Sequence, residues 1–405
     1  MPVDQLATLP VTGSLVESLS DGLRRLPGHP AALFGRGATS RLEQLLEAIG
    51  SRRCLVIRGQ NSYGRCGAAA HVERAAQGRE LLFVRAEPWR TTLEEVARTL
   101  EVLADFAPDT VLAVGGGSAL DLAKAVANLE PADPAELAEA IGQNRVLARS
   151  RALVLIPTTA GSGSELTQFA TLWNGPAKLS LDAPGLRADL ALIDPDLVAS
   201  APVPVAVAAA ADALCQAVES CWAVTANGES RALAGQAFRL LVPAIAAGCR
   251  CGSLADPALH EALMAGAALA GAAINLSRTT AAHALSYPLT ARLDLPHGAA
   301  VALHLPWLVE HNRTATAADC RLPEGPGWLA GLVAGLQAQS LELAGMELAE
   351  LSGRLLRLAG FPTSYAELHP SGQWREDLLE LSESPRMRNN PRQVGRADLL
   401  ALLAR

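Results

Sequence analysis

Four polar side chains in the second half of the chain have the types and spacing of a metal site. Asp212 and Gln216 lie four residues apart in an Ala-rich segment, so a helix would place both on one face. His283 and His297 follow, fourteen residues apart. One carboxylate and two imidazoles suit a divalent first-row metal, with the amide oxygen of Gln216 as a weak fourth ligand. Histidine pairs also occur without a metal, so this spacing alone leaves open two ordinary buried or surface histidines.

A glycine-rich turn in the first half has the features of a phosphate-binding loop. The apolar run Thr110–Val114 leads into three glycines and a serine and then into a helical pattern. Glycines leave room for a ligand to approach the backbone, and a helix N-terminus presents free N–H groups and a positive dipole end to a phosphate. The sequence differs from the Gly-x-Gly-x-x-Gly fingerprint, so taken alone it fits a plain tight turn equally well.

A second loop, residues 157–165, ends the apolar run Ala152–Ile156 with hydroxyls and glycines. Such a loop can form hydrogen bonds with a ribose or a pyrophosphate. Its other interpretation is a cap, in which Ser162 or Ser164 begins the next helix. The two loops follow neighbouring strands, which is where open α/β sheets bind ligands.

The elements that would position these loops alternate along the first half of the chain. Helical patterns such as Thr92–Phe106 separate short apolar runs, which predicts a parallel, doubly wound sheet. From about Val205 onward the pattern is helical, and Pro202 and Pro204 mark the change. We therefore predict an α/β nucleotide-binding domain over residues 1–200 and an all-helical metal-binding and catalytic domain over residues 201–405. The predicted strands are Cys54–Ile57, Leu81–Val84, Thr110–Val114, Ala152–Ile156 and Leu190–Ile193.

The composition of the chain disfavours some classes of binding partner. The net charge of the 405 residues is −7, which disfavours nucleic acid because phosphate backbones need clustered Lys and Arg. The most apolar stretch, Ala201–Ala211, is too short to span a bilayer, and residues 1–20 lack the pattern of a secretion signal. Seven cysteines without regular spacing predict reduced, buried thiols. We expect a cytoplasmic protein that binds a small molecule, with no nucleic-acid or membrane partner.

These motifs together resemble the iron-containing (group III) alcohol dehydrogenase family. The resemblance runs from about Pro30 to the C-terminus. It implies a dehydroquinate synthase-like fold, hydride transfer between NAD(P) and an alcohol carbon, and a homo-oligomer such as a dimer. The motifs that carry it, in family order, are the turn Gly115–Lys124, the loop Pro157–Glu165, the run Ala191–Pro195, the Asp212 helix and the segment His283–His297.

The resemblance also assigns roles to residues. Asp212, His283 and His297 match three metal ligands, and Gln216 stands where the family has a histidine; the metal would be Fe²⁺ or Zn²⁺. Tyr287 stands where many relatives have a histidine that relays the substrate proton, so Tyr287 or water would carry it. The first predicted strand ends without a carboxylate, which leaves NAD(H) and NADP(H) both open. The implied cofactor contacts are Gly115, Gly116, Gly117, Ser118, Asp121, Thr158, Thr159, Ser162 and Lys178.

The segment Ile274–Thr290 resembles the branch of the family that includes phosphonoacetaldehyde reductases. Arg278 would supply charge for an anionic head group, with hydroxyl donors around it. The alternative is that Arg278 pairs with an acidic neighbour and that the hydroxyls cap the His283 helix. A polyol or short-chain alcohol dehydrogenase stays possible, as does a nucleotide-binding protein whose catalytic site has eroded. The candidate hydroxyl donors are Ser277, Thr279, Thr280 and Ser286.

Overall fold

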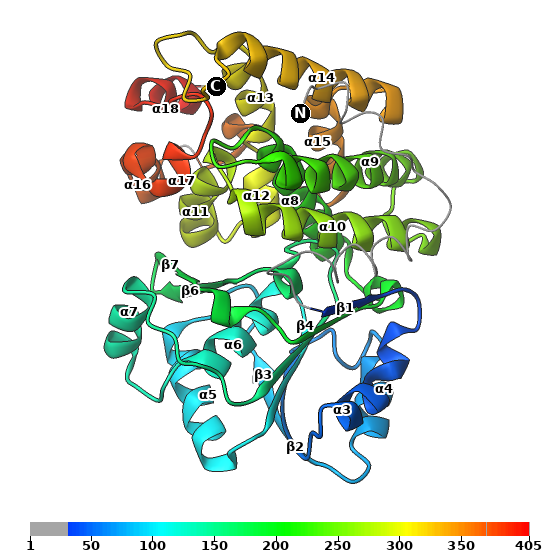
Figure 1. Ribbon diagram of the computed structural model, residues 1–405. Helices are drawn as coiled ribbons and strands as arrows, with labels where there is room; N and C mark the ends of the chain where they lie inside the picture. Colours follow the sequence, from blue (N-terminus) through cyan, green and yellow to red (C-terminus); the bar gives the residue numbers. More distant parts are fainter. Residues whose placement is uncertain (1–30, 370, 405) are drawn as a thin grey trace. The chain divides into compact units, whose positions relative to one another are not determined.

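The computed structural model describes residues 31–369 and 371–404 (Figure 1). They form two compact units, one ending at Ala201 and the other beginning at Pro202. The first unit contains the glycine-rich turn, and the second contains Asp212 and the two candidate histidine ligands. The expectation that residues 1–20 carry no secretion signal lies outside the described residues.

The first unit is built on a six-stranded sheet whose neighbouring strands are all parallel, in the order β1-β8-β5-β4-β2-β3. Its strands are β1 (Ala31–Phe34), β2 (Arg53–Gly59), β3 (Glu80–Ala86), β4 (Thr110–Gly115), β5 (Ala152–Pro157) and β8 (Leu190–Ile193). Its helices are α3 (Leu42–Ala48), α4 (Ala68–Ala75), α5 (Leu93–Phe106), α6 (Gly117–Asn128) and α7 (Pro134–Gly142), with 3₁₀ turns η1 (Ala38–Arg41), η2 (Ser164–Leu166), η3 (Pro184–Leu186) and η4 (Pro195–Val198).

Both faces of the sheet are buried at the central strands β2, β4 and β5, which explains why these strands are continuous apolar runs. Alternate residues of β2 belong to two different hydrophobic clusters. Leu55 and Ile57 pack with residues of α5, α6 and α7, whereas Cys54 and Val56 pack with residues of α3 and α4. Figure 1 shows these two groups of helices on opposite sides of the strands. The predicted doubly wound parallel sheet is confirmed.

Three strands were missing from the sequence prediction. β1 is only four residues long and joins the edge of the sheet beside β8. β6 (Phe169–Asn174) and β7 (Ala177–Asp182) form a separate antiparallel hairpin. The two residues between these strands are Gly175 and Pro176, and Gly175 has a positive φ of 55°. A glycine at the first position of a two-residue loop is a hairpin signal, so this element could have been found.

The second unit is helical, as predicted. Pro202 is the N-cap of its first helix and Pro204 lies in the first turn, where a missing N–H costs no intrahelical bond. The helices are α8 (Val203–Trp222), α9 (Gly228–Cys251), α10 (Pro257–Ser277), α11 (Ala281–Leu293), α12 (His297–Ala302), α13 (Leu305–Arg313), α14 (Pro326–Ala344), α15 (Leu348–Leu358), α16 (Gln373–Leu379), α17 (Pro385–Arg388) and α18 (Arg396–Leu403), with 3₁₀ turns η5 (Tyr365–Glu367) and η6 (Glu380–Glu383).

The sequence prediction made the apolar stretch at the start of the helical unit too short. The apolar stretch that begins at Ala201 continues to Trp222, and α8, α9 and α10 are each long and apolar enough to cross a membrane by length and composition. Between 61% and 78% of each apolar window is nevertheless buried inside the structure. These helices pack against one another, so their apolar character is explained by the core of the helical unit.

The cysteines depart from the prediction in one respect. Cys54, Cys66, Cys215 and Cys221 are buried free thiols, but Cys251 is exposed at the end of α9. The prediction of buried thiols is therefore correct for only some of the seven cysteines.

Candidate active site

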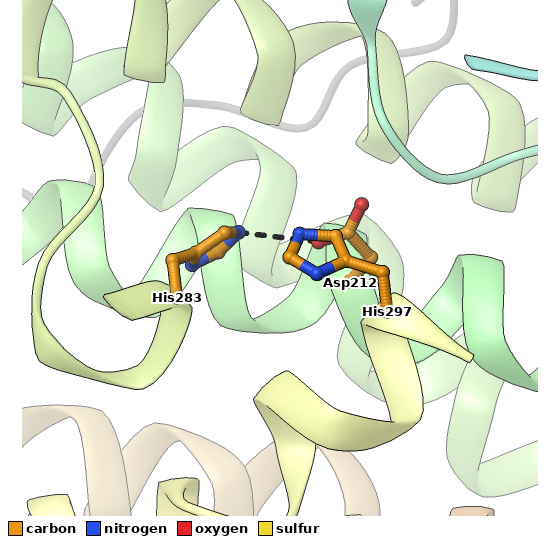
Figure 2. Close-up of side chains that lie close together, drawn as sticks. All are labelled: Asp212, His283 and His297. Atoms are coloured by element: carbon orange, nitrogen blue, oxygen red, sulfur yellow. Dashed lines mark hydrogen bonds and ion pairs between the residues drawn. The ribbon is translucent and has the colours of Figure 1, made fainter. Parts of the chain in front are cut away.

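Three side chains from different helices converge in the helical unit. Asp212 lies on α8, His283 on α11, and His297 is the first residue of α12. Figure 2 shows the two imidazoles and the carboxylate turned toward a common point. One ligand atom from each residue lies within 4.8 Å of the other two, and His283 Nε2 is 3.2 Å from Asp212 Oδ1. The structure thus brings together three of the four residues that the spacing suggested.

A second acidic residue, Glu219, lies behind His283 and was missed by sequence reasoning. Glu219 is fully buried, and its carboxylate contacts His283 Nδ1. The same carboxylate accepts hydrogen bonds from Thr280 Oγ1 at 2.6 Å and from Ala282 N at 2.9 Å. It is therefore fixed by three donors. A carboxylate in this position sets the tautomer of a histidine whose other nitrogen binds a metal.

Both ring nitrogens of His283 face carboxylate oxygens, Nδ1 facing Glu219 and Nε2 facing Asp212. A neutral imidazole has one N–H, so one carboxylate would face a lone pair unless a proton or a cation lies between them. Burial disfavours the charged ring, but the charge of Glu219 and the hydrogen bonds to both carboxylates outweigh it and raise the pKa of His283. The arrangement therefore attracts positive charge to the Asp212 side of the ring, which fits a divalent metal.

The second histidine is oriented in a similar way. Ser286 Oγ lies 3.2 Å from His297 Nδ1 and donates to the carbonyl of His283 at 2.7 Å. The rings of His283 and His297 meet edge to face, with centroids 5.5 Å apart. Ser286 was predicted to face an anionic substrate, but its described contacts are to the two histidine residues. It helps to hold them in position.

Gly298 explains how α12 comes close to α8. A Cβ built on Gly298 would lie 1.9 Å from the carbonyl oxygen of Ala208 and 2.9 Å from Asp212 Cβ. No larger residue fits there without moving the backbone of α8. A glycine directly after His297 is therefore what allows this histidine to approach Asp212.

Gln216 and Tyr287, the two positions where the resemblance led us to expect histidines, lie beside this cluster. Gln216 is buried one helical turn after Asp212 on α8. Tyr287 lies one turn after His283 on α11, and its ring stacks on His297 with centroids 6.2 Å apart. Burial raises the pKa of Tyr287 to about 12. Its hydroxyl therefore keeps its proton at neutral pH and can act as a hydrogen-bond donor.

The predicted substrate residues differ in their surroundings. Ser277 and Thr280 are fully buried. Ser277 Oγ contacts Ser220 Oγ and the carbonyl of Ala273, and Thr280 Oγ1 donates to Glu219. These two hydroxyls hold the segment in place. Arg278 has a positive φ of 61°, and its guanidinium donates to the carbonyl of Asn275. Thr279 Oγ1 accepts a hydrogen bond from an arginine that the sequence did not single out, Arg386.

In the α/β unit, the glycine turn and the second loop lie side by side at the ends of β4 and β5. Thr158 N donates to the carbonyl of Gly115. A Cβ on Gly115 would lie 2.6 Å from Ala119 Cβ, so this glycine serves packing. A Cβ on Gly116 would lie 3.4 Å from the Thr159 side chain, and one on Gly117 would lie 3.1 Å from Ser162 Oγ. The predicted cofactor residues of the two loops are thus neighbours.

Asp121 is engaged by protein donors. Its Oδ1 accepts from Ser164 Oγ at 2.6 Å, and its Oδ2 accepts from Thr171 N at 2.9 Å. Burial raises the pKa of Asp121, and the charges of Lys124 and Lys178 oppose that shift. Lys178 lies on β7, with its charge close enough to act on Asp121. Asp121 therefore ties the second loop and the hairpin to α6.

Lys124 is a further residue that sequence reasoning left without a role. It is fully buried, and its Nζ donates to Ser164 Oγ, Thr167 Oγ1 and the carbonyl of Phe169 at 2.8 to 2.9 Å. Burial lowers its pKa to about 8 and raises the pKa of the neighbouring Glu165 to about 7. A lone lysine on the apolar face of a predicted helix was the signal for such an internal contact.

Family models match nearly all of the chain in two parts. Residues 30–195 match the iron-containing alcohol dehydrogenase model, and residues 206–405 match the C-terminal model of the Fe-containing alcohol dehydrogenase family.

Individual proteins agree with these matches. The chain is 33% identical over 328 residues to phosphonoacetaldehyde reductase of Streptomyces viridochromogenes, which covers 77% of this chain and 80% of that protein. It is 27% identical over 383 residues to NAD-dependent methanol dehydrogenase of Bacillus methanolicus, covering 92% and 97%. The fold is similar to that of sulfoacetaldehyde reductase from Bifidobacterium kashiwanohense in complex with NAD⁺, with a TM-score of 0.78, 24% identity and coverage of 92% and 96%.

Proposed function

We propose that this chain, which belongs to the iron-containing alcohol dehydrogenase family, interconverts a small phosphonate-bearing aldehyde and its alcohol. Membership makes it an oxidoreductase that acts on a CH–OH group and implies a divalent metal and NAD(P). The observation that carries the metal part is the convergence of Asp212, His283 and His297 within 4.8 Å. The phosphonate part is supported by the likeness to phosphonoacetaldehyde reductase.

In this proposal each residue of the cluster has a role in holding the metal. Asp212 supplies a carboxylate oxygen, and His283 and His297 each supply a ring nitrogen. Glu219 keeps the proton of His283 on Nδ1, which leaves Nε2 available. Gln216 is the candidate for a fourth, weaker ligand through its amide oxygen.

A bound Fe²⁺ or Zn²⁺ would polarise the substrate oxygen, and a bound nicotinamide would exchange hydride with the adjacent carbon. The chain's own part is to orient and to move protons. Tyr287 keeps its phenolic proton at neutral pH and lies against His297, so it can donate a hydrogen bond to a polar group beside the cluster. Water is the other candidate for carrying the substrate proton.

The cofactor would lie on the two loops of the α/β unit. The turn at Gly116 and Gly117 leaves backbone partly exposed next to the start of α6, where N–H groups and the helix dipole favour a pyrophosphate. Ser118 belongs to the same turn. The proposal gives Thr158, Thr159 and Ser162 the sugar and phosphate contacts, and it leaves the choice between NAD and NADP to measurement.

The test is cofactor oxidation by protein reconstituted with Fe²⁺ or Zn²⁺. Phosphonoacetaldehyde and an uncharged aldehyde of similar size are each offered with NADH and with NADPH. We expect higher kcat/KM for the phosphonate and loss of activity in the presence of a chelator. Turnover of glycerol or short-chain alcohols without any turnover of the phosphonate pair would make this a general alcohol dehydrogenase. Binding of NAD(P) without turnover of any substrate would favour a nucleotide-binding protein.

A further inference from the structure

Arg386, on the short helix α17, lies next to residues of the candidate active site. Its NH1 donates to Thr279 Oγ1 at 2.6 Å, and its guanidinium carbon lies 5.8 Å from the centroid of the Tyr287 ring. Thr279 and Arg386 are 107 residues apart in the sequence, so no local pattern could have connected them. The proximity belongs to the folded helical unit.

A short path of rings leads from this arginine to the metal cluster. Tyr287 stacks on His297 at an interplanar angle of 21°, and His297 in turn contacts His283. One aromatic ring therefore separates the guanidinium of Arg386 from a residue of the cluster. A substrate whose reacting oxygen lies at the cluster would extend past the Tyr287 ring to reach Arg386.

Hydrogen bonds to main-chain carbonyls fix the position of α17, the helix that carries Arg386. Asn389, the C-cap of α17, donates through Nδ2 to the carbonyls of Ser277 and Thr279 at 2.9 and 3.0 Å. Arg321 NH1 donates to the carbonyl of Met387 at 3.0 Å. These contacts hold α17 against the segment that leads into α11. A cation positioned in advance loses less conformational entropy when it binds a ligand.

The charge of Arg386 also distinguishes it from other arginines of the same unit. Arg292 pairs with Asp377 and Arg392 pairs with Asp319, both within 2.9 Å. Among the side chains that the structure describes, no carboxylate forms an ion pair with Arg386. It is half-buried, and its contacts are a hydroxyl and an aromatic ring. No carboxylate among the described side chains therefore neutralises its positive charge.

Arg278, the arginine that the sequence suggested, is placed differently. It carries a backbone φ of 61° at the C-cap of α10, and its guanidinium is turned back to the carbonyl of Asn275. Arginine at the end of a helix commonly satisfies the last carbonyls in this way. The contact of Arg278 with Asn275 is thus explained by capping of α10, and this explanation does not apply to Arg386.

We propose that Arg386, together with the hydroxyls of Thr279 and Tyr287, forms the subsite that binds the anionic head group of the substrate. This inference rests on the proposed function and names the residue that gives it charge specificity. A guanidinium has five N–H donors in a planar fork, so it can bind two oxygens of a phosphonate while keeping its contact with Thr279. The same fork would accept a sulfonate or a carboxylate, and the experiment separates these.

The kinetic experiment compares Arg386→Ala with the wild type on phosphonoacetaldehyde and on an uncharged aldehyde of similar size. A hydrogen bond to a charged group corresponds to a loss of about 10- to 150-fold in kcat/KM for the phosphonate. We expect the ratio of the two kcat/KM values to fall by that factor, and Arg386→Lys to recover part of it. Arg388→Ala, at an exposed position of the same helix, is the matched control and should keep the wild-type ratio. Equal losses on both aldehydes in a folded Arg386→Ala protein would overturn the inference, as would a selective loss in Arg278→Ala alone.

A binding measurement separates this inference from the proposed function. Calorimetry follows methylphosphonate, methanesulfonate and acetate binding to the metal-loaded protein. Binding of any of these anions that weakens at least tenfold in Arg386→Ala supports the subsite, even if phosphonoacetaldehyde is not a substrate. Phosphonate turnover with anion binding that is the same in wild type and Arg386→Ala would keep the function and refute the subsite. Absence of anion binding by the wild type would also refute it.

Discussion

Replacing Glu219 with Gln changes a single buried group and tests whether it controls the metal site. One oxygen of Glu219 accepts from Thr280 Oγ1 and Ala282 N, and the other contacts His283 Nδ1. Glutamine has the same shape but only one acceptor oxygen, and its NH₂ group donates. It cannot satisfy all three donors at once.

Each orientation of the new amide has a defined cost. If its oxygen stays beside Thr280 and Ala282, its NH₂ group faces His283 Nδ1, which must then accept. The ring proton moves to Nε2, the nitrogen that faces Asp212, and a protonated nitrogen cannot bind a metal. If its oxygen faces His283, the buried N–H of Ala282 loses its acceptor, which costs about 1–3 kcal/mol.

We expect Glu219→Gln to lower metal affinity by roughly 10- to 100-fold, or about 1.4–2.7 kcal/mol. The assay is competition for Zn²⁺ between metal-free protein and a chromophoric chelator, because Zn²⁺ has no redox chemistry. Glu229→Gln, at an exposed position of α9, is the matched control. A folded Glu219→Gln protein that binds Zn²⁺ within about twofold of the wild type would refute the reasoning.

Three further changes test other parts of the structure. His297→Ala should leave a folded protein without turnover and with Zn²⁺ affinity reduced by more than about 100-fold, so retained activity would remove the metal mechanism. Gly116→Val should weaken NAD(P) binding in calorimetry by at least about tenfold, since its Cβ meets Thr159 only at ordinary contact distance while blocking backbone approach. Lys124→Met leaves the buried carboxyl groups of Asp121 and Glu165 without the charge of Lys124, which costs about 3–5 kcal/mol and lowers Tm by roughly 6–20 °C in a thermal melt. An unchanged Tm would show that this lysine contributes little to stability.

The fold was largely predictable because its signals are local. The continuous apolar runs of the central strands follow from burial on both faces of the sheet. Thr92 caps α5 through a hydrogen bond from Glu95 N, so the start of that helix is encoded in neighbouring residues. The short edge strand β1 was missed because four residues give too little pattern. The hairpin was missed although the glycine that opens its two-residue loop, Gly175, is a recognisable signal.

The contacts that refine the site were not predictable in the same way. Glu219 interrupts an apolar helix seven residues after Asp212, which signals a buried partner, but the partner lies 64 residues away on another helix. Arg386 and Thr279 are separated by 107 residues. Sequence spacing can show that a polar residue faces the core. Only tertiary packing decides which groups meet there.

The face of α8 that carries Asp212, Gln216 and Glu219 gives a reason why glutamine is compatible with this site. The three residues recur at helical spacing, so they share one face. Asp212 and Glu219 contact the two nitrogens of His283 from either side, which sets both the charge and the tautomer at this position. A glutamine between them is neutral, as an unprotonated histidine would be, so the charge that attracts a metal is kept. Compared with a histidine at this position, glutamine offers no nitrogen ligand. Metal binding should therefore depend more strongly on Glu219 than in a site with three histidines.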